Sequence, residues 1–159
     1  MSVRRILSVV GGLTLLCGGG GALAQPAPPP TPQIFAPGVI SGPSNDGAPT
    51  FSPDGRTLLF ERSYANSTAI FEAHRTGAGW SRPQVAAFSG PSSDQQPSFS
   101  PDGRYVVYAS SRLRPSTTQP GGPPEVYTHL WRVERRGQGW SEPERLPDTV
   151  NISRRMFKP

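Results

Sequence analysis

The sequence of 159 residues has very little cysteine and none of the common catalytic motifs. Cys17 is its single cysteine, so the chain can form neither an internal disulfide nor a cysteine metal site. Three patterns are absent: Gly-x-Ser-x-Gly, His-Glu-x-x-His and the phosphate-binding Gly-x-x-x-x-Gly-Lys. His74 and His129 have no cysteine or second histidine close in sequence. We therefore expect no catalytic residues, no cofactor and no bound metal.

Long apolar runs are also scarce, and the one near the N-terminus has the pattern of an export signal. Arg4 and Arg5 precede an apolar run at 6–16, and Ala22-Leu23-Ala24 fits a cleavage site. The run is too short for a permanent membrane span, which needs ~20 residues. Residues 1–24 are predicted to be a signal peptide cleaved after Ala24, which implies a periplasmic or secreted protein. A lipoprotein modified at Cys17 is the alternative.

Charge is modest. The formal net charge is +5, and removal of Arg4 and Arg5 leaves 14 basic and 11 acidic residues, or +3. The arginines are scattered over an exported chain, so we expect no nucleic-acid partner. Residues 25–38 are rich in proline, which cannot donate a backbone hydrogen bond, and are predicted to be an extended linker.

The most informative feature is an internal repeat. Residues 41–56 recur 48 positions later at 89–104, with 12 of 16 residues identical. Each copy predicts a β-hairpin, with strands at 50–52 and 57–60 in the first copy and at 98–100 and 105–108 in the second. Both second strands are apolar on both faces, so we expect them to be covered on both sides, as in stacked sheets. A repeat of this length in a β-rich chain predicts a propeller.

Further elements recur at a longer spacing than the hairpin does. A third strand at 69–75 matches 129–135, and Trp80 matches Trp140 in Gly-Trp-Ser-x-Pro. The extra length predicts an insertion in the second copy, and 112–124 has the composition of a long surface loop. A weaker fourth strand at 84–88, and from 144 onward in the second copy, completes four strands per unit.

These motifs together resemble the TolB-type, WD-like propeller repeats of bacterial periplasmic proteins. The matching elements are Asp-x-x-Pro, Phe-Ser-Pro-Asp-Gly-Arg with an apolar strand, an Ile-Phe or Leu-Trp strand, and Gly-Trp-Ser-x-Pro, over about residues 39–159. The resemblance implies an all-β fold with two four-stranded antiparallel blades, about 39–88 and 89–148, and the start of a third at 149–159. A propeller typically closes with 4 to 8 blades, so we expect an incomplete propeller with open faces.

Most candidate site residues are predicted to be structural. The repeated turns are formed by Pro53, Asp54, Gly55, Pro101, Asp102 and Gly103, with calcium binding by the aspartates as the alternative. Asp46 and Asp94 are expected to bond to backbone within or between blades. Residues predicted to pack between blades are Phe51, Phe99, Trp80 and Trp140, with ligand stacking by the tryptophans as the alternative. Arg112 and Arg114 of the inserted loop are the candidates for contact with a partner.

The leading interpretation is a non-enzymatic, exported module that binds an envelope or periplasmic protein or another envelope component, with no membrane span after signal removal. Three alternatives stay open. The chain could be a remnant of a longer propeller protein without a function of its own. Several copies could assemble and complete the propeller. It could also be a fragment of a carbohydrate-active propeller enzyme, although such sites need carboxylates that converge from more blades.

Overall fold

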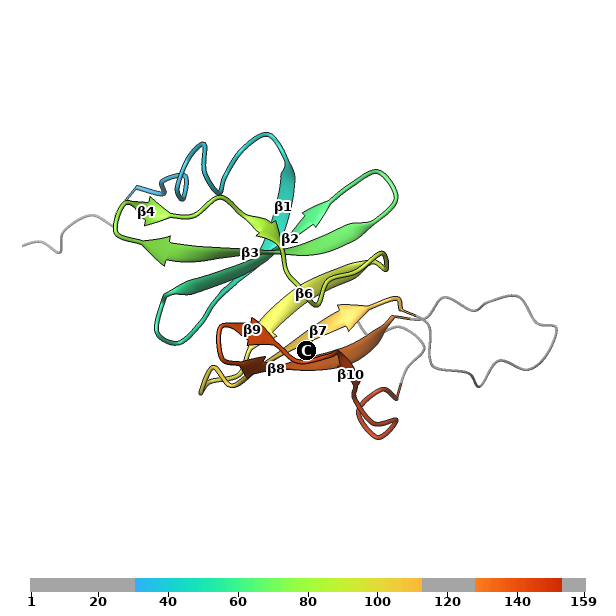
Figure 1. Cartoon of the computed structure of the whole chain (residues 1–159). Helices are drawn as coiled ribbons and strands as arrows, with labels where there is room; N and C mark the ends of the chain where they lie inside the picture. Colours follow the sequence, from blue (N-terminus) through green and yellow to red (C-terminus); the bar gives the residue numbers. More distant parts are fainter. Residues whose placement is uncertain (1–30, 113–127, 153–159) are drawn as a thin grey trace, which may run out of the picture. The chain divides into compact units, whose positions relative to one another are not determined.

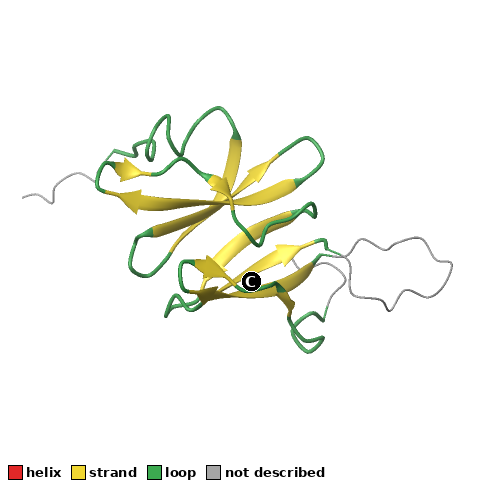
Figure 2. Cartoon of the chain, in the orientation of Figure 1, coloured by secondary structure: helices red, strands yellow, loops and turns green. Residues whose placement is uncertain are grey.

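The computed structural model describes residues 31–112 and 128–152, and in them the chain is all-β (Figures 1 and 2). Ten strands form two antiparallel sheets, and the described residues contain no helix. Both sheets belong to one compact unit that begins at Gln33. The predicted signal peptide, residues 25–30 of the linker, Arg114 and most of the predicted third-blade start lie outside the described residues.

The first sheet, blade 1, is an antiparallel meander. Its strands are β1 (Asn45–Phe51), β2 (Thr57–Ser63), β3 (Thr68–Thr76), β4 (Gly79–Trp80) and β5 (Gln84–Val85). The first three pair in sequence order, and β3 also pairs with β5 and, near its C-terminal end, with β4. Strands β1, β2, β3 and β5 form the four-stranded unit expected from the sequence, and β4 is a short addition that sequence reasoning did not predict as a strand.

The second sheet, blade 2, repeats this arrangement. Its strands are β6 (Asp94–Phe99), β7 (Tyr105–Ser110), β8 (His129–Arg136), β9 (Gly139–Trp140) and β10 (Glu144–Arg145). The order is β10-β8-β7-β6, with β9 paired to β8. The all-β prediction and the two antiparallel blade-like sheets are thereby confirmed.

The first strand of each blade is longer than predicted, because a β-bulge accommodates its proline. The register shifts between Gly47 and Thr50 in β1 and between Gln95 and Ser98 in β6. Proline cannot donate to a sheet, and an extra residue at a bulge lets the strand continue past it. Ala48 and Gln96 occupy the left-handed region, with φ of 44° and 52°. The same distortion therefore recurs at both equivalent positions.

The main core lies between the two blades. Leu59 and Ile70 of blade 1 pack with the apolar face of blade 2, and the buried cluster is completed by Ala86, Phe88, Val106, Tyr108, Trp131 and Val133. Because side chains alternate along a strand, the opposite side of blade 2 is turned away from blade 1. We call this side the far face of blade 2, and it carries Tyr105, Val107, Arg132 and Glu134.

A second core lies on the other side of blade 1, which we call its outer face. Leu58, Phe60, Phe71 and Ala73 are buried there under Ile40 and Ala36. The folded part thus begins earlier than the expected boundary at residue 39, since Ala36 already packs on this core and Phe35 contacts Phe51. The apolar residues of 34–40 explain the difference, because they can cover a face that water would otherwise meet.

Candidate binding surface

The two Ser-Pro-Asp-Gly turns have the same local structure. Asp54 accepts hydrogen bonds from the Ser52 hydroxyl and the Arg56 backbone N–H. Asp102 does the same with Ser100 and Arg104, and also accepts from the Arg104 guanidinium. The bond from Ser100, followed by the bonds from Arg104, lowers the pKa of Asp102 to about 2. Both carboxylates are therefore engaged with their own turns.

Pro53 and Gly103 belong to these turns and also meet between the blades. Gly55 and Gly103 have φ of +66° and +70°, a region that suits glycine. A Cβ at Gly103 would lie 3.0 Å from Cδ of Pro53 in the other blade, whereas a Cβ at Gly55 would meet nothing within 4 Å. Pro101 precedes Asp102 in the second turn and is exposed. The turn of blade 2 thus makes a close contact that the turn of blade 1 lacks.

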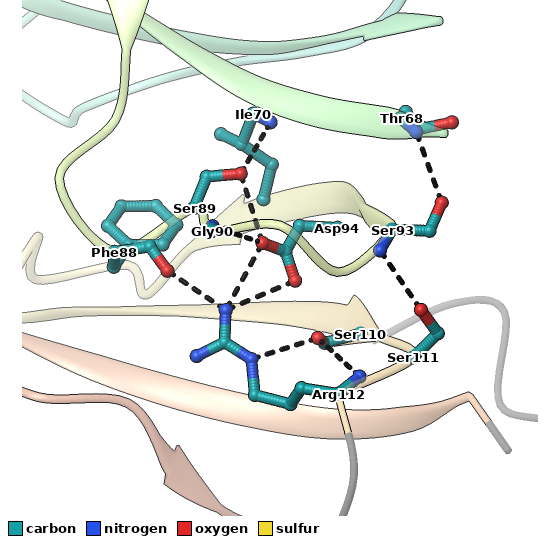
Figure 3. A network of polar contacts seen from close by, with 10 residues as sticks. All are labelled: Thr68, Ile70, Phe88, Ser89, Gly90, Ser93, Asp94, Ser110, Ser111 and Arg112. Carbon is teal, nitrogen blue, oxygen red and sulfur yellow. Dashed lines mark hydrogen bonds and ion pairs between the residues drawn. The ribbon is translucent and has the colours of Figure 1, made fainter. Parts of the chain in front are cut away.

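A buried polar network around Asp94 links the two blades (Figure 3). The Asp94 carboxylate accepts hydrogen bonds from the Ser89 hydroxyl, the Gly90 backbone N–H and the Arg112 guanidinium, all at 3.0–3.2 Å. Ser89 also accepts from the backbone N–H of Ile70 on β3, at 3.0 Å. The expectation that Asp94 bonds to backbone is met by Gly90, and Ser89 extends the contact to blade 1.

Arg112 does not behave as the free loop cation that the sequence predicted. Its Nη2 donates to Asp94 and to the Phe88 carbonyl, its Nε donates to Ser110, and its side chain is only 18% exposed. The guanidinium also lies over the rings of Tyr108 and Trp131, 5.5 and 5.2 Å from their centroids. Arg112 lies two positions after the end of β7, and its charge is used within the fold.

Asp46 is held in a similar way, by an arginine from a different position. It pairs with Arg62 through two hydrogen bonds of 2.7 and 2.9 Å, in place of the predicted backbone bond. Arg62 lies over Phe60 and Phe71, 5.5 and 4.7 Å from their ring centroids. In the alignment of the two hairpins, however, Arg62 matches Ser110 and not Arg112. Arg62 and Arg112 therefore pair with equivalent aspartates although they are not equivalent in the repeat, and only the folded chain shows this.

Trp140 lies in the interface between the blades. Its Nε1 donates to Oε2 of Glu72 in blade 1 at 3.1 Å. Its ring meets Phe88 edge-on with centroids 5.4 Å apart and Phe99 at 6.0 Å. Arg135 lies over the same indole and donates to the Thr57 hydroxyl across the interface. Trp140 and Phe99 therefore occupy the place between blades that the sequence suggested.

Trp80 and Phe51 instead form a partly exposed cluster on the outer face of blade 1. With Phe35, they make an aromatic group whose three centroid distances are 5.6, 5.8 and 5.8 Å. Phe35 and Phe51 are 43% and 44% exposed, and Trp80 is half-buried. Figure 1 shows the segment before β1 beside β4, which carries Trp80. Phe51 and Trp80 thus do not pack between two blades as predicted, because the described residues contain no sheet on this side.

Other interface residues were missed by sequence reasoning. Glu61 Oε2 accepts from the backbone N–H of Gln96 at 2.9 Å, across the two blades. The Asn151 side chain accepts from the N–H of Leu130 and donates to its carbonyl, and in the preceding unit the Ser89 hydroxyl accepts from the N–H of Ile70. The contact of Asn151 with Leu130 could have been predicted from the repeat, because Ile70 and Leu130 match each other in the aligned third strands.

The described surface also contains shallow hollows that are lined by ionisable side chains. One of about 580 Å³ on blade 2 is lined in part by Glu134, which pairs with Arg132 and Arg136. Another of about 420 Å³ on blade 1 contains His74 and Glu72, 3.6 Å apart.

Within 31–112 and 128–152, no group of three His, Cys, Asp or Glu is placed to hold a metal ion. The same residues include no helix with the length and apolarity to cross a membrane.

Known protein structures include one that is similar to part of this chain. No protein-family model matches the chain, and no curated protein matches it. Among solved structures, the chain is similar to TolB from Acinetobacter baumannii, with 27% identity and a TM-score of 0.40. The match covers 63% of this chain and 20% of that one, so this chain matches about a fifth of that protein.

Proposed function

We propose that this chain is an exported, non-enzymatic propeller segment that binds a protein of the bacterial envelope or periplasm. The observation that carries the proposal is the partly exposed aromatic cluster of Phe35, Phe51 and Trp80. Partly exposed aromatic side chains are typical of protein interaction surfaces, where they supply a large contact area. Export is inferred from residues 1–24, which have the pattern of a signal peptide.

The non-enzymatic part of the proposal is supported by the state of the carboxylates. Asp54 and Asp102 accept hydrogen bonds from their own turns, and Asp46 and Asp94 are paired with arginines. A pair of acid and base carboxylates for glycoside hydrolysis would have to converge on a common space. These four aspartates each have a structural partner instead.

The proposal is tested by site-specific photocrosslinking in cells of the organism that encodes the chain. A benzophenone amino acid replaces Phe51 in the aromatic cluster or, as the control, Val85 on β5, which is 50% exposed. We expect a discrete protein adduct from position 51 and none from position 85. An adduct from neither position, or equal adducts from both, would overturn the proposal that the cluster binds a protein.

A further inference from the structure

The interface between the two blades provides a template for what could cover the outer face of blade 1. In that interface, Glu72 of blade 1 accepts a hydrogen bond from the Trp140 indole. Phe88 supports the same indole edge-on, and Arg135 lies over its ring, 4.8 Å from the centroid. The template therefore consists of an aromatic support, a stacked arginine and a carboxylate that comes from the neighbouring sheet.

Trp80 has the first two of these contacts but lacks the third. It pairs with Arg75 in the register in which Trp140 pairs with Arg135, and Arg75 lies 5.8 Å from its ring. Phe35 meets Trp80 edge-on at 5.8 Å, much as Phe88 meets Trp140. No residue in the described part of the chain accepts a hydrogen bond from Nε1 of Trp80 or from the guanidinium of Arg75. The missing component is the carboxylate.

The exposure of equivalent residues in the two blades also indicates that blade 1 lacks a neighbouring sheet near Trp80. Phe51 is exposed on blade 1, whereas Phe99, its counterpart in the repeat, is half-buried. Pro49 and Arg75 are exposed, and their counterparts Pro97 and Arg135 are buried and half-buried. Around Phe51 and Arg75, blade 1 therefore presents to solvent a part of the surface that blade 2 presents to a neighbouring sheet, whereas the centre of its outer face is already covered by Ile40 and Ala36.

We infer that the exposed part of the outer face of blade 1, around Phe51 and Trp80, docks a β-sheet face of a different polypeptide, one that offers a carboxylate to the Trp80 indole N–H beside Arg75. The inference rests on the proposed function and names the chemistry of its partner. A carboxylate suits the site because it accepts hydrogen bonds and neutralises the nearby guanidinium. The new sheet would cover Phe51 and Trp80, as blade 1 covers Phe99 and Trp140.

A second copy of this chain does not fit the template. The sheet face that it would offer is the far face of blade 2, where Arg132 is the counterpart of Glu72 and Ala109 is the counterpart of Glu61. A guanidinium cannot accept a hydrogen bond, and an alanine side chain has no acceptor. Head-to-tail stacking would also place Arg132 against the site of Arg75. The chemistry therefore selects against assembly of identical copies at this face.

The first experiment supplies the missing carboxylate within the chain itself. The triple variant R132E/E134H/E144Q copies Glu72, His74 and Gln84 onto the far face of blade 2. We expect the wild type to sediment as a monomer and the triple variant to self-associate head to tail, because its far face now complements Trp80. Adding Trp80→Phe should weaken that association by roughly tenfold or more, the worth of a hydrogen bond to a charged group.

The matched control is R132L/E134H/E144Q, which removes the arginine without adding an acceptor and should stay monomeric. Two results would overturn the inference: a triple variant that is folded by circular dichroism yet monomeric, or association that Trp80→Phe leaves unchanged. Wild-type chains that associate through Trp80 would show that a second copy is the occupant.

The second experiment keeps the wild-type residues on the far face of blade 2. It tests this inference independently of the proposed function. Trp80→Phe and Arg75→Ala are combined with the photocrosslinker at position 51, and the adduct is mapped by mass spectrometry. We expect both substitutions to reduce the adduct several-fold, and the crosslinked segment to contain an aspartate or glutamate. A strong adduct that neither substitution affects would refute the carboxylate while leaving the proposed function intact. Loss of any adduct in the unsubstituted chain would refute the function itself.

Discussion

Asp94 shows at the scale of one residue how the two blades are joined. Its side chain is fully buried, and three different groups donate to it, from the segment before β6 and from Arg112 after β7. A buried charge without its partner is costly, whereas a partly exposed pair contributes little. Asp46 and Arg62, each 20% exposed, form the partly exposed pair that serves as a comparison.

We therefore expect Asp94→Ala to lower the free energy of unfolding by roughly 3 kcal/mol, because it leaves the Arg112 guanidinium without its carboxylate. Asp46→Ala should cost only about 1 kcal/mol. Urea denaturation followed by fluorescence measures both values. The double variant Asp94→Ala/Arg112→Leu should recover part of the loss, and equal costs at the two aspartates would contradict this account.

The Asp102 turn predicts a dependence of stability on pH. Its pKa is lowered from 3.8 to about 2 by the bonds from Ser100 and Arg104, so the folded chain binds this proton more weakly than the unfolded chain. The stabilisation is present above about pH 4 and is lost as the pH falls through the folded pKa near 2. The stability difference between wild type and Asp102→Asn should thus shrink between pH 5 and pH 2 in thermal melts. Glu142→Gln, at an exposed position, is the control and should show no such trend.

At the scale of the element, the two Pro-Asp-Gly hairpins have the same local sequence and different surroundings. Both glycines have a left-handed φ, so replacement by alanine strains either turn by roughly 1 kcal/mol. Gly103 additionally faces Cδ of Pro53 at 3.0 Å, whereas Gly55 faces open space. The difference between the turns arises from contact between blades and not from the hairpin itself.

We expect Gly103→Ala to destabilise the chain more than Gly55→Ala, because only the former forces Pro53 to move. The midpoint of thermal unfolding, measured side by side for both variants, checks the order. Adding Pro53→Ala should bring Gly103→Ala close to Gly55→Ala. The opposite order of midpoints would mean that the two turns do not meet in solution.

At the scale of the whole molecule, the main core belongs to neither blade alone. Leu59 and Ile70 of blade 1 are fully buried only because Val106 and Val133 of blade 2 cover them. A single sheet of this kind cannot bury both of its faces, and small isolated sheets are marginally stable in water. The stable unit is therefore the stacked pair.

Residues 31–88, which contain blade 1 alone, should accordingly show no cooperative thermal transition by circular dichroism, while the full chain should unfold cooperatively. The expected cause is exposure of Leu59 and Ile70 to water. A sharp transition and well-dispersed amide signals for the shortened chain would show that blade 1 folds independently.

Much of this architecture could be predicted from local sequence, because its cause is local. The repeated Pro-Asp-Gly turn favours a hairpin wherever it occurs, and the apolar β7 indicates a strand covered on both faces. Strand ends were less predictable, since the bulges that carry β1 and β6 past Pro49 and Pro97 depend on pairing with the next strand.

The sequence by itself determined that the chain is all-β, that it contains two copies of one unit, and that their turns have a common design. Only the tertiary structure decided which equivalent residues have equivalent surroundings. Trp140 and Trp80 occupy the same place in the repeat, yet the former donates to Glu72 of the other blade and the latter lies beside the exposed ring of Phe51. The physical reason is that hydrogen bonding and burial depend on the neighbouring sheet, and a repeat specifies a blade without specifying what stands next to it.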